Sequence, residues 1–321
     1  MSCFGLRHLI YFERLEDLNF LLHTHANSGD FWSELITEVL WHGFLDTLKL
    51  ILFLFLTYLL MEFIEHKASG KTLGFIKKAG PLGPLPGALV GAVPQCGFSA
   101  AAANLYTGRV ITVGTLVAVF ISTSDEMLPI LISGGFPATD ILIILAYKIV
   151  VAIAVGFAID GILRLLGKKD EEINIDELCD ADDCHCERGI LHSAIHHTMT
   201  TSLFILLVTM IINAAVFFIG EDALALVMRN TPVLSHAIAA IFGLIPNCAA
   251  SVILASLASE GIITAGTMMA GLFSGSGIGL LVLFRVNKNL KQNLTITALL
   301  VAVGFVFGLL ADFVPFLANL L

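Results

Sequence analysis

Apolar stretches long enough to cross a lipid bilayer recur along this 321-residue chain, for example Leu48–Phe63 and Thr200–Phe218. About 20 apolar residues span a hydrocarbon core of ~30 Å as a helix. Only 13% of the residues are charged and 57% are hydrophobic, which excludes a soluble enzyme and a disordered chain. The net charge of −9 argues against nucleic acid as a partner. The sequence therefore predicts an all-α polytopic membrane protein whose surroundings are the lipid bilayer.

The N-terminus and the cysteines point to no processing and no disulfide framework. The first residues, MSCFGLRHLIYFERLEDLNF, lack both a long apolar core and a small-residue cleavage site, so we expect no removed signal peptide. The six cysteines are spread between apolar segments and one acidic loop, which is not the spacing of a disulfide-stabilised scaffold.

The chain contains an internal duplication. When residues 88–131 are aligned without gaps on residues 240–283, 16 of 44 positions are identical. The identities include Pro94/Pro246, Cys96/Cys248, Thr112/Thr264 and Gly114/Gly266, each pair 152 residues apart. A further match, Ala154–Phe157 with Ala302–Phe305, lies at a slightly shorter offset. Each unit should hold a long helix, a Pro-broken hairpin, an interrupted helix and another long helix, as in many secondary transporters.

Equivalent loops of the two units carry opposite charge. Lys67–Lys78 contains four lysines, whereas its counterpart Gly220–Pro232 has two acids and one arginine. Ser133–Asp140 has no basic residue, whereas its counterpart Arg285–Asn293 has three. Because cytoplasmic loops collect Lys and Arg, this bias predicts two inverted repeats, with a parallel repeat as the alternative.

Inversion requires an odd number of crossings in each half. Three full crossings plus a re-entrant hairpin at Leu85–Tyr106 meet this condition, and so would a hairpin that makes two thin crossings. Both versions give about ten helical segments. We expect an N-terminal amphipathic, acidic region (1–43), membrane repeat 1 (44–166), a cytoplasmic acidic Cys/His linker (167–190) and membrane repeat 2 (191–321), in the inner (plasma) membrane.

The paired Pro-x-Cys hairpins are the first candidate site. Proline breaks a helix, and broken backbone at membrane depth is tolerated only where it is buried in protein or lines a cavity. Each break is followed by an amide, a thiol and a hydroxyl, and these predict substrate-binding residues Gln95, Cys96, Ser99, Asn247, Cys248 and Ser251. The alternative is that the cysteines are small apolar fillers.

The interrupted third segment is the second candidate. Its two copies contribute the substrate-binding candidates Ser122, Ser124, Ser274 and Ser276. Asp125 and Glu126 follow the first Ser-x-Ser, and acids inside an apolar span mark ion or proton paths. We therefore expect one of them to carry transported charge or a coupling proton, unless both lie solvated at a helix end.

Other polar residues fall within the spans. Lys148 can pair with Asp125 or Glu126, and a cationic substrate would displace it. His196 and His197 are either proton carriers or interfacial residues, and we assign coupling to His197. Asp160 and Arg164 are expected only to extend toward the interface.

The linker is the third candidate site. Lys168–Arg188 contains nine acids together with Cys179, Cys184, His185 and Cys186. Thiolates and imidazole favour soft or borderline metals, so this segment would capture or sense metal in the cytosol. The alternative is a solvated linker kept extended by its charge.

The motifs VGAVPQCGFS and FGLIPNCAAS, their repetition and the Cys/His linker resemble the family of ten-transmembrane heavy-metal exporters. Its members are described as arsenic efflux proteins or manganese transporters. The similarity covers roughly Phe44 to Phe316 and leaves residues 1–43 outside. It implies efflux of a heavy metal or metalloid without fixing which one.

Two kinds of cargo fit different residues. Manganese favours carboxylate, carbonyl and water ligands, whereas trivalent arsenic favours thiols. Because only two thiols lie in the membrane core, we favour a divalent cation such as manganese. Arsenite or organoarsenical efflux and export of a small organic anion, held by helix N-termini, are the alternatives.

We expect a secondary transporter rather than an enzyme. The chain contains no G-x-x-x-x-G-K-[ST] motif and no H-E-x-x-H motif, so an ion gradient would drive transport by alternating access. No permanent cofactor is expected beside the transported metal or metalloid, and the chain is compatible with a homo-oligomer.

Overall fold

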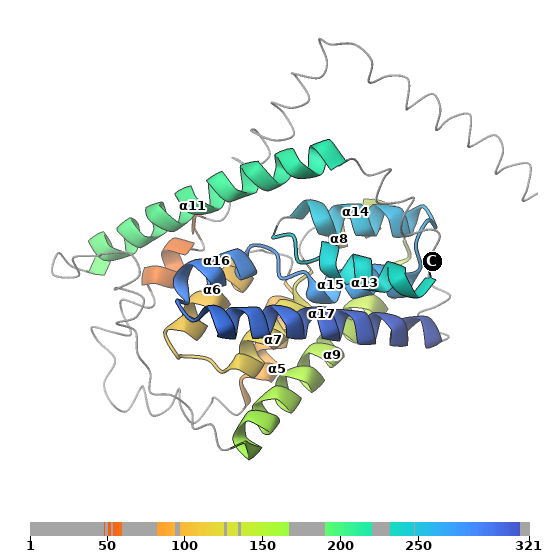
Figure 1. Cartoon of the computed structure of the whole chain (residues 1–321), viewed down its shortest axis with the longest axis horizontal. Helices are drawn as coiled ribbons and strands as arrows, with labels where there is room; N and C mark the ends of the chain where they lie inside the picture. Colours follow the sequence, from red (N-terminus) through yellow and green to blue (C-terminus); the bar gives the residue numbers. More distant parts are fainter. Residues whose placement is uncertain are drawn as a thin grey trace, which may run out of the picture.

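A computed structural model describes residues 48, 51–52, 54–59, 82–93, 97–124, 127–133, 136–166, 190–219, 232–246 and 248–314. This part of the chain is all-helical (Figure 1). Its helices are α5 (Pro84–Gly91), α6 (Gly97–Thr107), α7 (Val113–Ser122), α8 (Met127–Ser133), α9 (Ala138–Leu165), α11 (Ile190–Ile219), α13 (Pro232–Phe242), α14 (Cys248–Ser259), α15 (Ala265–Ser274), α16 (Gly279–Val286) and α17 (Leu290–Phe313). The described residues between 48 and 59 are also helical.

Four of these stretches are long and apolar enough to cross a membrane: Ala138–Leu165, Ala194–Ile212, Ala265–Val286 and Leu290–Phe313. In the third, 78% of the most apolar window is buried, against 33% in each of the others. The broken pair α15–α16 is therefore more buried than the three long helices, which carry many exposed apolar side chains. The prediction of an all-α polytopic membrane protein is confirmed.

The predicted helix breaks are present. Helix α7 ends at Ser122 and α15 ends at Ser274, the first serine of each Ser-x-Ser motif. Short helices α8 and α16 follow these breaks. Helices α5 and α6, like α13 and α14, flank the two Pro-x-Cys motifs. The order of elements in both halves therefore follows the order predicted from the duplication.

In the first half, the carboxylate of Asp160 binds the N-terminus of α7. Thr112 precedes this helix, and its hydroxyl oxygen accepts a hydrogen bond from the Thr115 N–H. Asp160 of α9 accepts from the Thr112 hydroxyl at 2.6 Å and from the Gly114 N–H at 2.9 Å. Asp160 is only 5% exposed, so the expectation that it merely extends toward the interface is wrong. Two donors at a helix N-terminus compensate its burial.

The same arrangement recurs 152 residues later. Asp312 of α17 accepts from the Thr264 hydroxyl at 3.0 Å and from the Gly266 N–H at 2.9 Å. It also pairs with Nε2 of His236 at 2.9 Å. The first half has Pro84 in the position of His236, so this contact between histidine and carboxylate is specific to the second half.

The long helices keep the 152-residue register. A Cβ on Gly156 would lie 2.8 Å from the Gly114 carbonyl oxygen, and a Cβ on Gly308 would lie 2.8 Å from that of Gly266. Gly156 and Gly308 are 152 residues apart. The match of Ala154–Phe157 with Ala302–Phe305 is therefore displaced by one helical turn from the structural equivalence.

Helices of each half pack against helices of the other half. Helix α6 of the first half packs on α16 of the second, and α14 of the second packs on α8 of the first. Within each half, α7 packs between α5 and α9, and α15 packs between α13 and α17. This reciprocal arrangement is the one that a two-fold relation between the halves produces.

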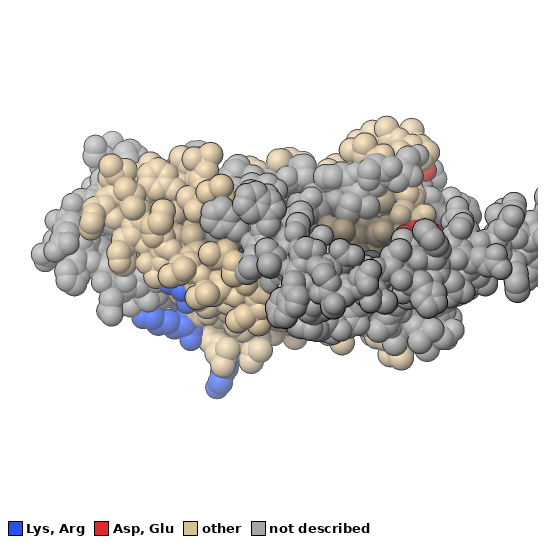
Figure 2. All heavy atoms as spheres, turned by 90° about the horizontal axis from the view of Figure 1, so that it is seen from above, with Lys and Arg blue, Asp and Glu red and all other residues tan. Residues whose placement is uncertain are grey.

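The long helices α9 and α17 lie at an angle to each other. In Figure 1, α9 runs toward the lower left, whereas α17 runs to the right, where the chain ends. On the face drawn in Figure 2, Lys and Arg side chains gather at the left end and acidic atoms lie toward the right.

Candidate functional site

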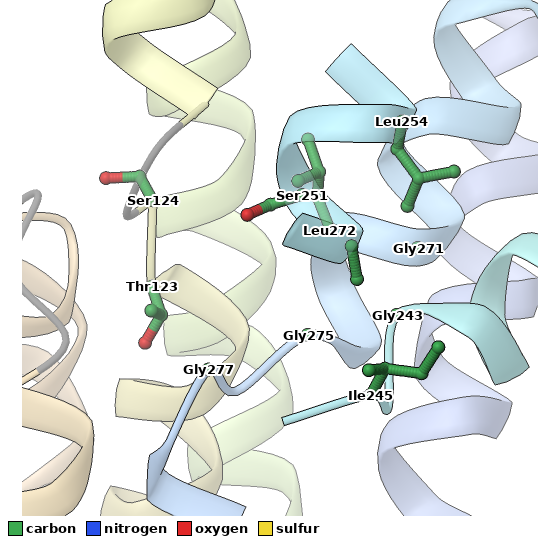
Figure 3. Close-up of a pocket in the computed structure, with 11 residues that line it drawn as sticks. Thr123, Ser124, Gly243, Ile245, Ser251, Leu254, Gly271, Leu272, Gly275 and Gly277 are labelled. Carbon is green, nitrogen blue, oxygen red and sulfur yellow. The ribbon is translucent and has the colours of Figure 1, made fainter. Parts of the chain in front are cut away.

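A pocket lies where the broken helices of the two halves meet (Figure 3). Thr123 and Ser124, at the break after α7, form one wall. The other walls belong to the second half, from the end of α13, helix α14 and the break after α15. The lining residues are Thr123, Ser124, Gly243, Ile245, Ala250, Ser251, Leu254, Gly271, Leu272, Gly275 and Gly277. The cavity itself is small, with a volume of about 20 Å³.

The polar atoms of this pocket are hydroxyl groups and backbone. Thr123 donates its hydroxyl hydrogen to the Val119 carbonyl at 2.8 Å, and Ser124 donates to the Ala92 carbonyl at 2.7 Å. In Figure 3 the Ser251 hydroxyl projects from α14 toward the Thr123–Ser124 segment, whereas Ser124 points away from it. Two predicted residues, Ser124 and Ser251, are thus brought to one pocket from opposite halves.

Lys148 brings its amine group to the wall of this pocket. It is fully buried in the middle of α9, and its Nζ donates to the carbonyl oxygens of Thr123 and Leu272. Both of these residues line the pocket, and they belong to different halves. The equivalent position in the second half is Leu300, so the duplication supplies one such lysine.

The predicted serines at the ends of α7 and α15 serve close packing. Ser122 donates to the Val119 carbonyl at 3.1 Å and Ser274 to the Gly271 carbonyl at 2.9 Å. A Cβ on Gly91 would lie 2.2 Å from the Ser122 Oγ, and one on Gly243 would lie 2.6 Å from the Ser274 Oγ. Each serine therefore packs against a glycine of the preceding hairpin helix and does not line the pocket.

Ser99 and Ser276 are also buried outside the pocket lining. Ser99 of α6 faces Gly279 of α16, where a Cβ would lie 2.7 Å from its Cβ. The Ser276 carbonyl accepts from the Gly279 N–H at 3.1 Å. Ser99 thus lies at the contact between the two halves, and Ser276 precedes the start of α16.

Other predicted site residues lie outside the described part of the chain: Gln95, Cys96, Asp125, Glu126, Asn247, Cys179, Cys184, His185 and Cys186. Cys248 begins α14, and its side chain is not described. Among the residues that the structure describes, no group of three or more His, Cys, Asp or Glu side chains is placed to hold a metal ion. The predicted roles of all these residues stay predictions.

The two neighbouring histidines have different surroundings. His197 is buried and stacks on Tyr58, with 5.2 Å between ring centroids, whereas His196 is exposed. The Tyr58 hydroxyl lies 2.8 Å from the Thr201 hydroxyl oxygen and donates to the Asn104 Oδ1 at 3.4 Å. Tyr58, Asn104 and Thr201 were not predicted from the sequence. The spacing of His197 and Thr201, one helical turn, was the available signal.

Comparison with known proteins identifies the family. Residues 33–227, more than half of the chain, match a family described as "Putative, 10TM heavy-metal exporter". No curated protein and no solved structure matches the chain. The match begins upstream of Phe44, where the resemblance noted above started, and ends before the second Pro-x-Cys motif. The resemblance is confirmed, and the chain belongs to this family of ten-transmembrane heavy-metal exporters.

Proposed function

We propose that this chain is a secondary-active exporter that binds its cargo in the pocket between the two halves, with a divalent cation such as manganese as the favoured cargo. The observation that carries the proposal is the contact of Lys148 with the Thr123 and Leu272 carbonyls. An ammonium group occupies there the oxygen ligands that a hard divalent cation uses. The cation would displace Lys148 on binding, and Lys148 would return when the cation leaves.

Alternating access is supported by the way the halves are joined. The pocket lies at two helix breaks, and each half supplies part of its wall. We propose that the halves are inserted as inverted repeats in the inner membrane, with the linker in the cytoplasm. The gathering of basic side chains in one part of the surface (Figure 2) supports this orientation. Transport rather than catalysis, driven by an ion gradient, is the activity we expect.

The same lysine favours a second class of cargo. A fixed positive charge beside hydroxyl groups suits a neutral or anionic species, such as arsenite, an organoarsenical or a small organic anion. In that case the cargo would bind to Lys148 instead of replacing it. The two cargo classes therefore predict opposite effects when the charge of Lys148 is removed.

The experiment measures transport and binding by purified protein in vesicles, with Mn²⁺, Zn²⁺, arsenite and a methylated arsenical offered separately. For a cation cargo, Lys148→Met should bind Mn²⁺ at least as tightly as the wild type but lose gradient-driven efflux. For an anionic or neutral cargo, the variant should lose binding. Lys291→Gln, an exposed lysine at the start of α17, is the matched control. A wild-type chain that moves none of the four cargoes would contradict the proposed function.

A further inference from the structure

Tyr147 of α9 donates its hydroxyl hydrogen to the backbone carbonyl of Phe307 in α17, at 2.8 Å. The two residues belong to different halves and are 160 residues apart in the chain. Helix α9 packs mainly on α7 and α5 of its own half, and α17 packs mainly on α15 and α13 of the other. This hydrogen bond therefore joins two groups of helices that are each packed within one half.

Aromatic rings position the Tyr147 hydroxyl. The Tyr147 ring meets Phe273 of α15 edge to face, with 5.6 Å between ring centroids, and Phe273 meets the Phe307 ring in the same manner at 6.4 Å. Phe273 is fully buried, and edge-to-face pairs at these distances are favourable beyond the area that they bury. A hydroxyl at membrane depth also needs an acceptor within the protein, because lipid supplies none. A helix carbonyl has a second lone pair that can accept it.

The next residue of α9 also contacts the second half. Lys148 donates to the Leu272 carbonyl, and Leu272 directly precedes Phe273 in α15. Two consecutive residues of α9 thus bind two helices of the second half, Lys148 through α15 and Tyr147 through α17. Because α9 is one continuous helix, a rigid movement that takes Lys148 away from Leu272 also takes Tyr147 away from Phe307.

The duplication does not repeat these contacts. At the offset of 152 residues, Tyr147 and Lys148 correspond to Leu299 and Leu300, and leucine side chains donate no hydrogen bond. In an alternating-access cycle, one half rocks against the other. The second conformation then lacks the hydrogen bond between Tyr147 and Phe307, and Leu299 supplies no counterpart. This contact therefore makes the two conformations unequal in stability.

We infer that Tyr147 is a positioning residue for transport: its hydrogen bond to Phe307 holds the two halves in the present conformation and is released when they move. The inference rests on the proposed function, because it needs a cycle with a second conformation. It goes beyond that function by naming a contact outside the pocket lining that sets the balance between the two conformations. Loss of one such hydrogen bond changes an equilibrium about threefold to tenfold.

The first test needs no cargo. Spin labels are attached through Leu142→Cys and Leu294→Cys in a cysteine-depleted full-length chain, and the distances between them are measured. These two exposed positions on α9 and α17 are 152 residues apart. We expect Tyr147→Phe, which keeps the ring, to raise the ratio of the second conformation to the first about threefold to tenfold. Tyr106→Phe is the matched control and should leave the ratio unchanged, because the buried Tyr106 hydroxyl has no hydrogen-bond partner among the described residues.

The same comparison is repeated in a Lys148→Met chain. This variant lacks the neighbouring contact with Leu272, so the second conformation should be more populated and easier to measure. A Tyr147→Phe variant that keeps the distance distribution of its parent in both chains would overturn the inference. A fall in thermal stability without a change in the distance ratio would also overturn it, because that is the result expected of a residue that only supports the fold.

The second test measures Mn²⁺ transport in vesicles. Mn²⁺ would take the carbonyl oxygens that Lys148 leaves, and an apparent affinity rises with the population of the conformation that can bind. Tyr147→Phe should therefore lower the Mn²⁺ concentration at half-maximal rate by about threefold to tenfold, and Tyr106→Phe should behave like the wild type. An unchanged concentration in Tyr147→Phe would count against the inference. If the wild type moves no Mn²⁺, the proposal of a cation exporter loses its support, and the distance measurement alone decides whether Tyr147 sets the balance.

Discussion

The hydroxyl of Thr112 donates to the carboxylate of Asp160 at 2.6 Å, and 152 residues later Thr264 donates to Asp312 at 3.0 Å. Each carboxylate also accepts from the backbone of a glycine in the first turn of the adjacent helix. In both halves, these hydrogen bonds link a long helix to the N-terminus of a helix that is followed by a break. The contacts of Asp160 and Asp312 position α7 and α15, and both of these helices end at the pocket.

We predict that Asp160→Asn destabilises the protein by about 1.5–3 kcal/mol, the range for hydrogen bonds to charged groups. The amide is neutral, and its NH₂ group would face the Gly114 N–H or the Thr112 hydroxyl as a second donor. Thermal unfolding of detergent-purified protein measures the effect. Asp140→Asn, at the other end of α9 and less buried, is the control and should shift the midpoint far less. Equal shifts of the unfolding midpoint in the two variants would contradict a specific stabilising role of the Asp160 hydrogen bonds.

The contact between hairpin and broken helix predicts a steric effect. In Gly91→Ala, the new Cβ would lie 2.6 Å from the Val119 carbonyl oxygen, and in Gly243→Ala it would lie 2.1 Å from that of Gly271. Backbone atoms cannot rotate away, so each variant should lose about 1–3 kcal/mol or more of stability.

Gly161→Ala is the matched control for these glycines. A Cβ at Gly161, also in a helix, would meet nothing within 4 Å, and alanine favours helix by about 1 kcal/mol over glycine. It should therefore keep or raise the yield of monodisperse protein, as measured by size-exclusion chromatography. A Gly91→Ala variant as stable as Gly161→Ala would contradict the close packing.

The thiols separate the cargo classes. If the cargo is a hard divalent cation, Cys96→Ser and Cys248→Ser should each keep much of the transport, because hydroxyl and carbonyl oxygens remain. If the cargo is trivalent arsenic, each change should abolish transport, because bonds to sulfur select it. We expect the first outcome, measured as Mn²⁺ efflux. Arsenite resistance that disappears with either cysteine, without Mn²⁺ efflux in any variant, would assign the site to arsenic instead.

Inverted insertion predicts where equivalent loops are accessible. The connections after α6 and after α14 are 152 residues apart in sequence, with Arg109 in the first and Glu260 in the second. Cysteines introduced at these two positions in a cysteine-depleted chain should react with an impermeant thiol reagent from opposite sides of the membrane. The Arg109→Cys variant should react from the cytoplasm. Labelling of both from one side would favour a parallel repeat.

Much of this architecture was predictable because duplicated sequence records duplicated contacts. Pro94/Pro246 and the paired Ser-x-Ser motifs predicted the hairpins and the breaks at Ser122 and Ser274. The role of Asp160 was not predicted, because a single acid near a helix end has no periodic signal. Its relation to Asp312 at the common offset was present in the sequence, but the match of two Ala-Val-Gly-Phe segments suggested a register one turn away.

The site was less predictable than the fold. Serines were singled out by their repetition, yet Ser122 and Ser274 pack against glycines while Ser124 and Ser251 line the pocket. The pairing of Lys148 with Asp125 or Glu126 stays a prediction, because both acids lie outside the described residues. The contacts of Lys148 with two backbone carbonyls were not predicted. Helix ends expose such carbonyls only after tertiary packing brings two breaks together, and no local sequence pattern encodes that meeting.

The exchange of helices between the halves has a consequence for how the protein is made. Helix α6 finds its partner α16 only after the ribosome has synthesised nearly the whole second repeat. Until then, the face of α6 that carries Ser99 is without its final neighbour, Gly279 of α16. The first repeat is therefore incompletely packed until the second repeat has been made. A chain truncated before α16 should be degraded by membrane proteases rather than persist as a stable half-protein.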